Sequence, residues 1–151
     1  MPRIDFYTLE PASPGDRYLL TCRLVERTYA EQLRVLIHCP DTAAAQHLDR
    51  LLWTFRQESF IPHGLVGQAD PALTPVLIGS PGTPANEEQV LINLCLETPP
   101  FFSRFARICE PVDQDPAVLA AARERFRDYR AAGFPPTHHP IRLTPGDAKH
   151  W

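Results

Sequence analysis

Near its end the chain carries an i, i+4, i+7 series formed by Arg123, Arg127 and Arg130. In a helix these three side chains lie on one stripe, and Phe126 stands beside it. Guanidinium groups next to an aromatic ring suit a ligand that is both anionic and apolar. A solvated helix face, balanced by the acidic residues between the arginines, explains the same pattern. The spacing leaves both interpretations open.

A second group of large side chains runs from Trp53 through Phe60 to His63, at the end of a predicted helix and in the loop after it. If Trp53 and Phe60 pack inward, they belong to the core, where aromatic side chains are common. If they face solvent, they form a patch suited to a protein partner, because exposed aromatic residues anchor interfaces. The pattern alone does not choose between these two.

Catalysis has one candidate, in which Cys39 with His38 or His63 acts as nucleophile and base for hydrolysis or redox chemistry. A cysteine that ends an apolar strand is more often a buried small hydrophobe. His138 and His139 lie in a Pro-rich segment without a third ligand nearby, so we expect no metal. The chain has no phosphate-binding Gly-x-x-x-x-Gly-Lys-Ser/Thr motif and no dinucleotide-binding glycine spacing after its first strand, so we expect no cofactor.

Alternating strand and helix signals along the chain position these residues. The apolar runs and caps predict strands over residues 3–9, 34–39, 76–79, 89–95 and 105–109, and helices over 16–32, 41–55 and 115–132. Asp41 and Asp115 are placed as N-caps, and Gly133 as the stop of the last helix. This order is typical of an α/β fold with a parallel sheet. From Pro135 onward we expect an extended or loose tail.

Composition limits the class of protein. A length of 151 residues, with 44% hydrophobic and 22% charged residues, predicts one folded domain. The net charge of −3 disfavours direct binding to nucleic acid. The four cysteines lie far apart and indicate reduced core thiols. Without an N-terminal signal-like stretch or an apolar window of about 18 residues, we expect a cytoplasmic protein that does not enter the membrane.

Four segments in order resemble one known family. They are the strand with Phe6 and Tyr7, the run RVLIHC at 34–39 followed by LDRLLW at 48–53, ESFIPH at 58–63, and RERFRDYRAAGF at 123–134. Together they are similar to the chi subunit of bacterial DNA polymerase III over residues 3–134. Trp followed after a short gap by Glu-Ser-Phe-x-Pro-His is the most specific part of the resemblance.

The resemblance implies a three-layer α/β/α domain over residues 1–134, Rossmann-like but without a nucleotide-binding loop, with a mostly parallel or mixed central sheet and a Pro-rich tail over 135–151. It implies a noncatalytic accessory subunit of the polymerase holoenzyme, monomeric when isolated and in contact with nucleic acid only indirectly. A small α/β enzyme using Cys39 is the alternative.

Two partners are implied by the family. The psi subunit, which joins chi to the clamp loader, would contact Trp53 and Phe60. The acidic C-terminal tail of single-stranded DNA-binding protein would contact Val112, Arg123, Phe126, Arg127 and Arg130. Family members carry Tyr where this chain has Phe126 and Lys where it has Arg127. A phenol hydroxyl is thereby lost while the positive charge is kept.

Overall fold

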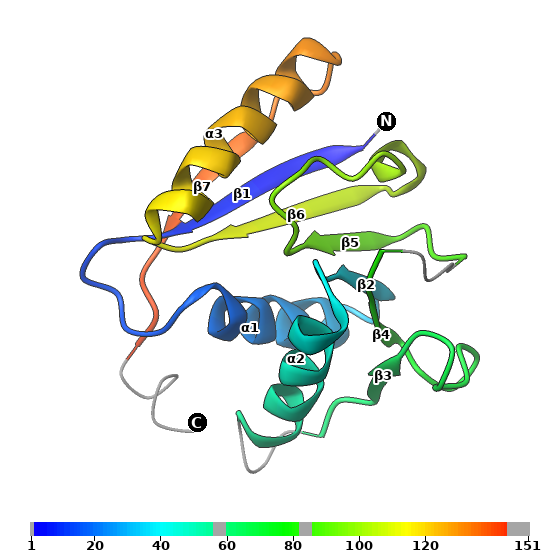
Figure 1. Ribbon diagram of the computed structural model, residues 1–151. Helices are drawn as coiled ribbons and strands as arrows, with labels where there is room; N and C mark the ends of the chain where they lie inside the picture. The colour runs from blue at the N-terminus through cyan, green and yellow to red at the C-terminus, as the bar shows by residue number, and fades with distance from the viewer. Residues whose placement is uncertain (1, 56–59, 82–85, 145–151) are drawn as a thin grey trace.

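A computed structural model describes residues 2–55, 60–81 and 86–144 (Figure 1). Strands and helices alternate along most of the chain. In order, the elements are β1 (Arg3–Leu9), α1 (Arg17–Ala30), β2 (Val35–His38), α2 (Thr42–Thr54), β3 (His63–Leu65), β4 (Val76–Gly79), β5 (Val90–Asn93), the short 3₁₀ helix η1 (Phe102–Arg104), β6 (Arg107–Val112), α3 (Pro116–Ala131) and β7 (Thr137–Ile141).

The strands form a single seven-stranded sheet in the order β3-β4-β2-β5-β6-β1-β7, and every neighbouring pair is parallel. Helices α1 and α2 cover one face of the sheet and α3 covers the other (Figure 1). The predicted α/β fold with three layers is therefore confirmed. Because both faces are covered, the central strands are apolar on both sides, which explains the near-continuous apolar runs of β2, β4 and β5.

Acidic N-caps set where the helices begin. The Asp41 carboxylate accepts a hydrogen bond from the Ala44 amide at 2.8 Å, and the Asp115 carboxylate accepts one from the Ala117 amide at 2.9 Å. Helix α3 stops before Gly133, whose φ of 91° is in the left-handed region that favours glycine. These predicted caps and the predicted stop are confirmed.

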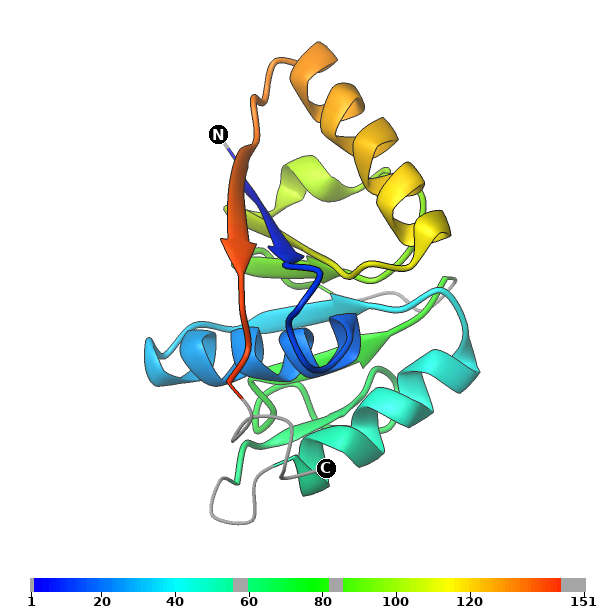
Figure 2. The ribbon, with the colours of Figure 1, turned by 90° about the vertical axis from the view of Figure 1, so that its left-hand side faces the viewer.

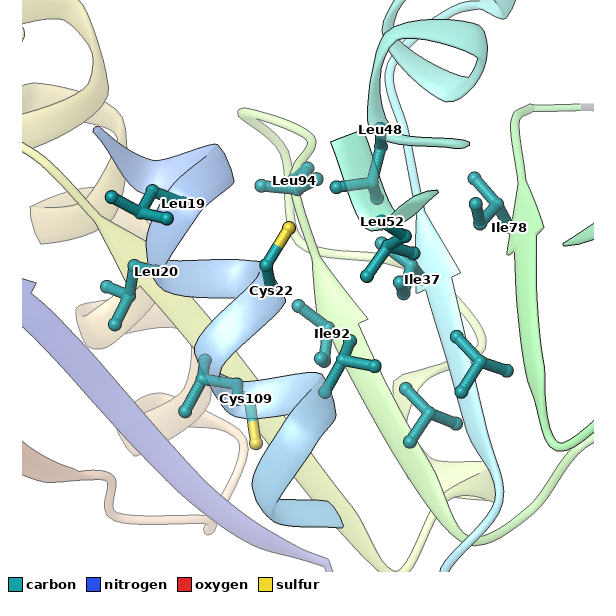
Figure 3. Close-up of a cluster of buried hydrophobic side chains, with 14 of the residues drawn as sticks. Leu19, Leu20, Cys22, Ile37, Leu48, Leu52, Ile78, Ile92, Leu94 and Cys109 are labelled. Carbon is teal, nitrogen blue, oxygen red and sulfur yellow. The ribbon is translucent and has the colours of Figure 1, made fainter. Parts of the chain in front are cut away.

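Two apolar cores lie on the two faces of the sheet. Figure 3 shows part of the larger core, where Cys22 of α1 lies near Ile92 of β5 and Leu48 and Leu52 of α2 lie near Ile37 of β2. The smaller core contains Val118, Ala122 and Tyr129 of α3, packed against β1 and β6. The four cysteines are free and buried, as predicted.

Strands β3 and β7 were not predicted. Strand β7 lies at the edge of the sheet beside β1 (Figure 2), with His138 level with Phe6 and His139 level with Tyr7. The segment after Pro135 is thus extended, but five of its residues belong to the sheet. Its sequence, Thr-His-His-Pro-Ile, has no apolar alternation, because an edge strand needs little burial and tolerates a proline. The rest of the predicted tail, 145–151, is outside the described residues.

A buried ion pair joins α3 to the sheet. Arg125 and Glu110 are both almost completely buried, with the Arg125 Nε 3.1 Å from a Glu110 oxygen. The hydroxyl of Tyr129 donates to the other Glu110 oxygen at 2.7 Å, and the Asn93 amide donates to the same carboxylate. A second nitrogen of Arg125 donates to the Leu96 carbonyl at 2.8 Å. Both charges are therefore compensated, as burial of charged groups requires.

No helix in the described parts of the chain has both the length and the apolar character needed to cross a membrane.

We expect Arg125→Ala to lower the free energy of unfolding by about 3–5 kcal/mol, because it leaves the Glu110 carboxylate buried without its charge partner. Arg127→Ala, two residues along the same helix and exposed, should change it by less than about 0.5 kcal/mol. Urea unfolding followed by circular dichroism measures both. Equal, small effects would show that the buried pair is not needed for stability.

The thiols should be unreactive in the native protein. Burial raises the pKa of the Cys39 and Cys109 thiols to about 12 and that of Cys95 to about 11, and it also raises the pKa of Cys22. Since only the thiolate attacks a disulfide reagent, labelling at pH 8 should be slow, and all four thiols should react once the chain is unfolded in guanidinium. One thiol that reacts rapidly without denaturant would contradict this burial.

Candidate functional site

A pocket of about 430 Å³ lies between α3 and the strands β1, β6 and β7. We call it the α3 pocket. It is lined by Phe6, Thr8, Val112, Leu119, Ala122, Arg123, Phe126 and His138. The lining is mainly apolar, and no carboxylate is among these described residues. An apolar side chain with a negative charge close to it fits such a pocket.

The structure brings together four of the five residues expected to bind the acidic tail. Val112, Arg123 and Phe126 line the α3 pocket. Val112 is buried, whereas Phe126 is half-buried with its ring centroid 5.2 Å from that of Phe6. Arg130 lies next to the pocket, and its guanidinium carbon is 5.3 Å from the centroid of the Phe126 ring. The α3 pocket therefore has an apolar floor and guanidinium groups at its border.

Arg127, the fifth residue, is exposed and does not line the α3 pocket. Its guanidinium pairs instead with Glu124 on the same helix. The inward positions of α3 are occupied by Arg125 and Tyr129, which contact Glu110. Because Arg125 and Tyr129 face the sheet, the three arginines of the stripe lie at the side of the helix or in solvent.

Sequence reasoning missed the residues that the strands contribute to this pocket. Phe6 and Thr8 come from β1, which was predicted as a strand but not connected to the arginines. His138 comes from β7 and was considered only as a metal ligand. No sequence pattern connected these residues, because β7 has no apolar alternation and its pairing with β1 was not predicted.

Trp53 and Phe60 form a separate exposed patch, which we call the Trp53 patch. The side chains are 53% and 66% exposed, and their ring centroids are 5.4 Å apart. The ring of His63 lies beneath, 4.7 Å from Trp53, and its nitrogens lie 2.7 Å from the Ile61 carbonyl oxygen and 3.0 Å from that of Asp49. Of the two interpretations left open, the solvent-facing one is therefore correct. Residues 58 and 59 of the motif are outside the described residues.

The geometry does not favour Cys39 as a nucleophile. Its thiol is buried, and a pKa of about 12 leaves almost no thiolate at neutral pH. Both ring nitrogens of His63 lie within hydrogen-bond distance of backbone carbonyl oxygens. Across residues 2–55, 60–81 and 86–144, no three His, Cys, Asp or Glu side chains are grouped so that they could hold a metal ion.

Among solved structures, domain 2 of the DEAD-box helicase Mss116p, bound to an RNA duplex, has a similar fold. The TM-score is 0.61 at 10% identity, and the match covers 95% of this chain and 66% of that one. At this identity the likeness shows the fold alone. It agrees with the layered α/β arrangement described above.

Sequence comparisons identify the family. The family model described as DNA polymerase III chi subunit, HolC, matches residues 1–137. DNA polymerase III subunit chi of Pseudomonas aeruginosa is 42% identical over 139 residues, covering 92% of this chain and 96% of the relative. The subunit of the same name from Escherichia coli is 34% identical, covering 89% and 95%. The chain therefore belongs to the DNA polymerase III chi subunit family.

Proposed function

We propose that this chi-family chain is a noncatalytic adaptor of the DNA polymerase III holoenzyme. It links the clamp loader, through the psi subunit, to the acidic C-terminal tail of single-stranded DNA-binding protein. This activity takes place in the cytoplasm, where the tail-bearing protein coats the template. Nucleic acid is contacted only through that protein, in keeping with the net charge of −3.

The α3 pocket is the observation that carries the proposal. Its lining is mainly apolar and, among the described residues, contains no carboxylate; Arg123 lies in it and Arg130 beside it. The last apolar side chain of the tail enters the α3 pocket and packs against Phe126, and the arginines bind the acidic groups around it. The hydroxyl that Phe126 lacks relative to other family members is not needed, because this ring acts through packing against Phe6.

The strength of such a contact follows from its size. One buried aromatic side chain contributes about 1.5–3 kcal/mol and each charge-assisted hydrogen bond about 1.5–3 kcal/mol, while association costs at least about 4 kcal/mol. The result is a weak contact in the micromolar range. Several tails on one single-stranded DNA-binding protein raise the effective concentration, so a weak contact is sufficient to keep the assembly at the template.

The Trp53 patch supports the psi contact. Two neighbouring aromatic rings that are more than half exposed are typical anchors of a protein interface. The patch is at the β3 side of the sheet and the α3 pocket is at the β7 side, and these strands are the two edges. One chain can therefore bind both partners at once.

Arg123→Glu should abolish binding of a synthetic acidic tail peptide, because it places a negative charge inside the α3 pocket. Arg123→Ala should weaken binding about ten- to hundredfold, the loss of a charge-assisted hydrogen bond. Arg127→Ala should have a smaller effect, since that side chain pairs with Glu124 outside the pocket. Isothermal titration calorimetry at low salt measures all three.

Arg50→Glu is the matched control, because Arg50 is exposed on α2, away from the α3 pocket. It makes the same change in net charge and should bind the peptide like the wild type. If Arg50→Glu and Arg123→Glu weaken binding equally, the effect comes from overall charge and the proposed site is wrong.

Trp53→Ala should abolish copurification with psi while lowering the free energy of unfolding by less than about 2 kcal/mol, because the side chain is half exposed. Leu73→Ala is the control, since Leu73 is also apolar and is 76% exposed. Pull-down with tagged psi and urea unfolding are the measurements. Retention of psi by Trp53→Ala, or its loss with Leu73→Ala, would rule out the Trp53 patch as the anchor.

A further inference from the structure

We propose that β7 forms a second wall of the α3 pocket and that its His138 binds the terminal carboxylate of the tail together with Arg123. This inference rests on the proposed tail binding and goes beyond it. His138 belongs to the segment after Pro135, which was predicted from the sequence to be an extended or loose tail.

The register of the sheet places His138 at the pocket. His138 is level with Phe6 in the β1–β7 pairing, and the Phe6 ring packs against Phe126 of α3. Accordingly His138 lines the same pocket, from the strand side, while Arg123 lines it from the helix side. These are the two ionisable side chains among the described residues of the lining. His138 is also exposed, so its ring can meet a ligand without a change in the backbone.

The position of β7 does not depend on His138 itself. Its neighbour His139 points to the other face, with Nε2 2.8 Å from a carboxylate oxygen of the buried Asp5 and its ring stacked on Tyr7 at 4.9 Å. Together with the backbone pairing to β1, these contacts hold the strand. Substitution of His138 therefore removes a side chain from the pocket and leaves the wall in place.

A terminal carboxylate fits two donors on opposite walls. It has two oxygens, each able to accept hydrogen bonds, so a guanidinium and an imidazole can bind one carboxylate together. An apolar C-terminal residue with a free carboxylate can place its side chain against the apolar lining and its charge between the two donors. An amidated C-terminal residue has one carbonyl oxygen and no charge, so it can make only the apolar contact well. His138 should thus increase the preference for a free C-terminus.

The family model matches residues 1–137, so His138 lies just beyond the matched segment. Strand β7 thus begins at the last residue of the segment that the family model matches. The sequence around His138, two histidines followed by Pro140, contains no pattern that predicts binding of a carboxylate.

The test compares two peptides of the acidic tail, one with a free C-terminus and one amidated, on wild type, His138→Ala and His138→Gln. At pH 6 we expect His138→Ala to bind the free-acid peptide about five- to tenfold more weakly, the loss of one charge-assisted hydrogen bond partly compensated by water. The amidated peptide should change less than about twofold, because it lacks the charge that His138 recognises. His47→Ala, an exposed histidine on α2, is the control and should match the wild type.

The pH profile separates charge from shape. A charged imidazole binds a carboxylate more strongly than a neutral one, so binding of the free-acid peptide by wild type should strengthen when the pH is lowered from 8 to 6. The described lining of the α3 pocket holds no carboxylate, so no acidic side chain of the lining contributes to this profile. His138→Gln keeps a hydrogen-bond donor without the charge and should lose this strengthening. Unchanged melting temperatures will show that both variants fold.

Two results would overturn the inference, and they are distinguishable. If wild type binds the free-acid peptide and both His138 variants bind it equally well with the same pH profile, His138 has no part in the site and the proposed tail binding stands. If wild type binds neither peptide, the proposed tail binding itself fails and this inference fails with it.

Discussion

The ion pair between Glu110 of β6 and Arg125 of α3 determines which side of α3 faces solvent. Both groups are buried, and Tyr129, Asn93 and a backbone carbonyl complete their hydrogen bonds. Rotation of the helix would expose the arginine and leave the carboxylate buried and unpaired, at a cost of several kcal/mol. The remaining positions of the helix are oriented as a consequence. Because Arg125 is held against the sheet by Glu110, Phe126 packs on Phe6 of β1 and Arg123 lines the α3 pocket.

The parallel sheet separates the two candidate binding surfaces. The crossover from β6 through α3 to β7 brings the last strand to the edge beside β1, whereas α2 and β3 are at the opposite edge. Two partners on opposite edges need not compete. This arrangement suits an adaptor, whose task is to hold two proteins together at the same time. The chemistry of the two surfaces also differs, since one is an apolar pocket bordered by cations and the other an exposed pair of aromatic rings.

Much of the fold could be predicted from the sequence because local signals agree with the tertiary structure. The caps Asp41 and Asp115 and the stop at Gly133 lie where the helices begin and end. The role of Arg125 could not be predicted, because its partner is on another element and an arginine in a charged helix resembles its exposed neighbours. His138 was missed for a related reason: an edge strand has little apolar pattern, so the pairing of β7 with β1 is visible only in three dimensions.

The central claim is that the α3 pocket receives an acidic peptide that ends in a free carboxylate. Titration of isotope-labelled protein with such a peptide, followed by two-dimensional NMR, tests it most directly, because each backbone amide reports separately. We expect saturable shifts at Phe6, Val112, Arg123, Phe126 and His138, with Trp53 and Phe60 unaffected. Shifts centred on the Trp53 patch, or no saturable shifts at all, would contradict the claim.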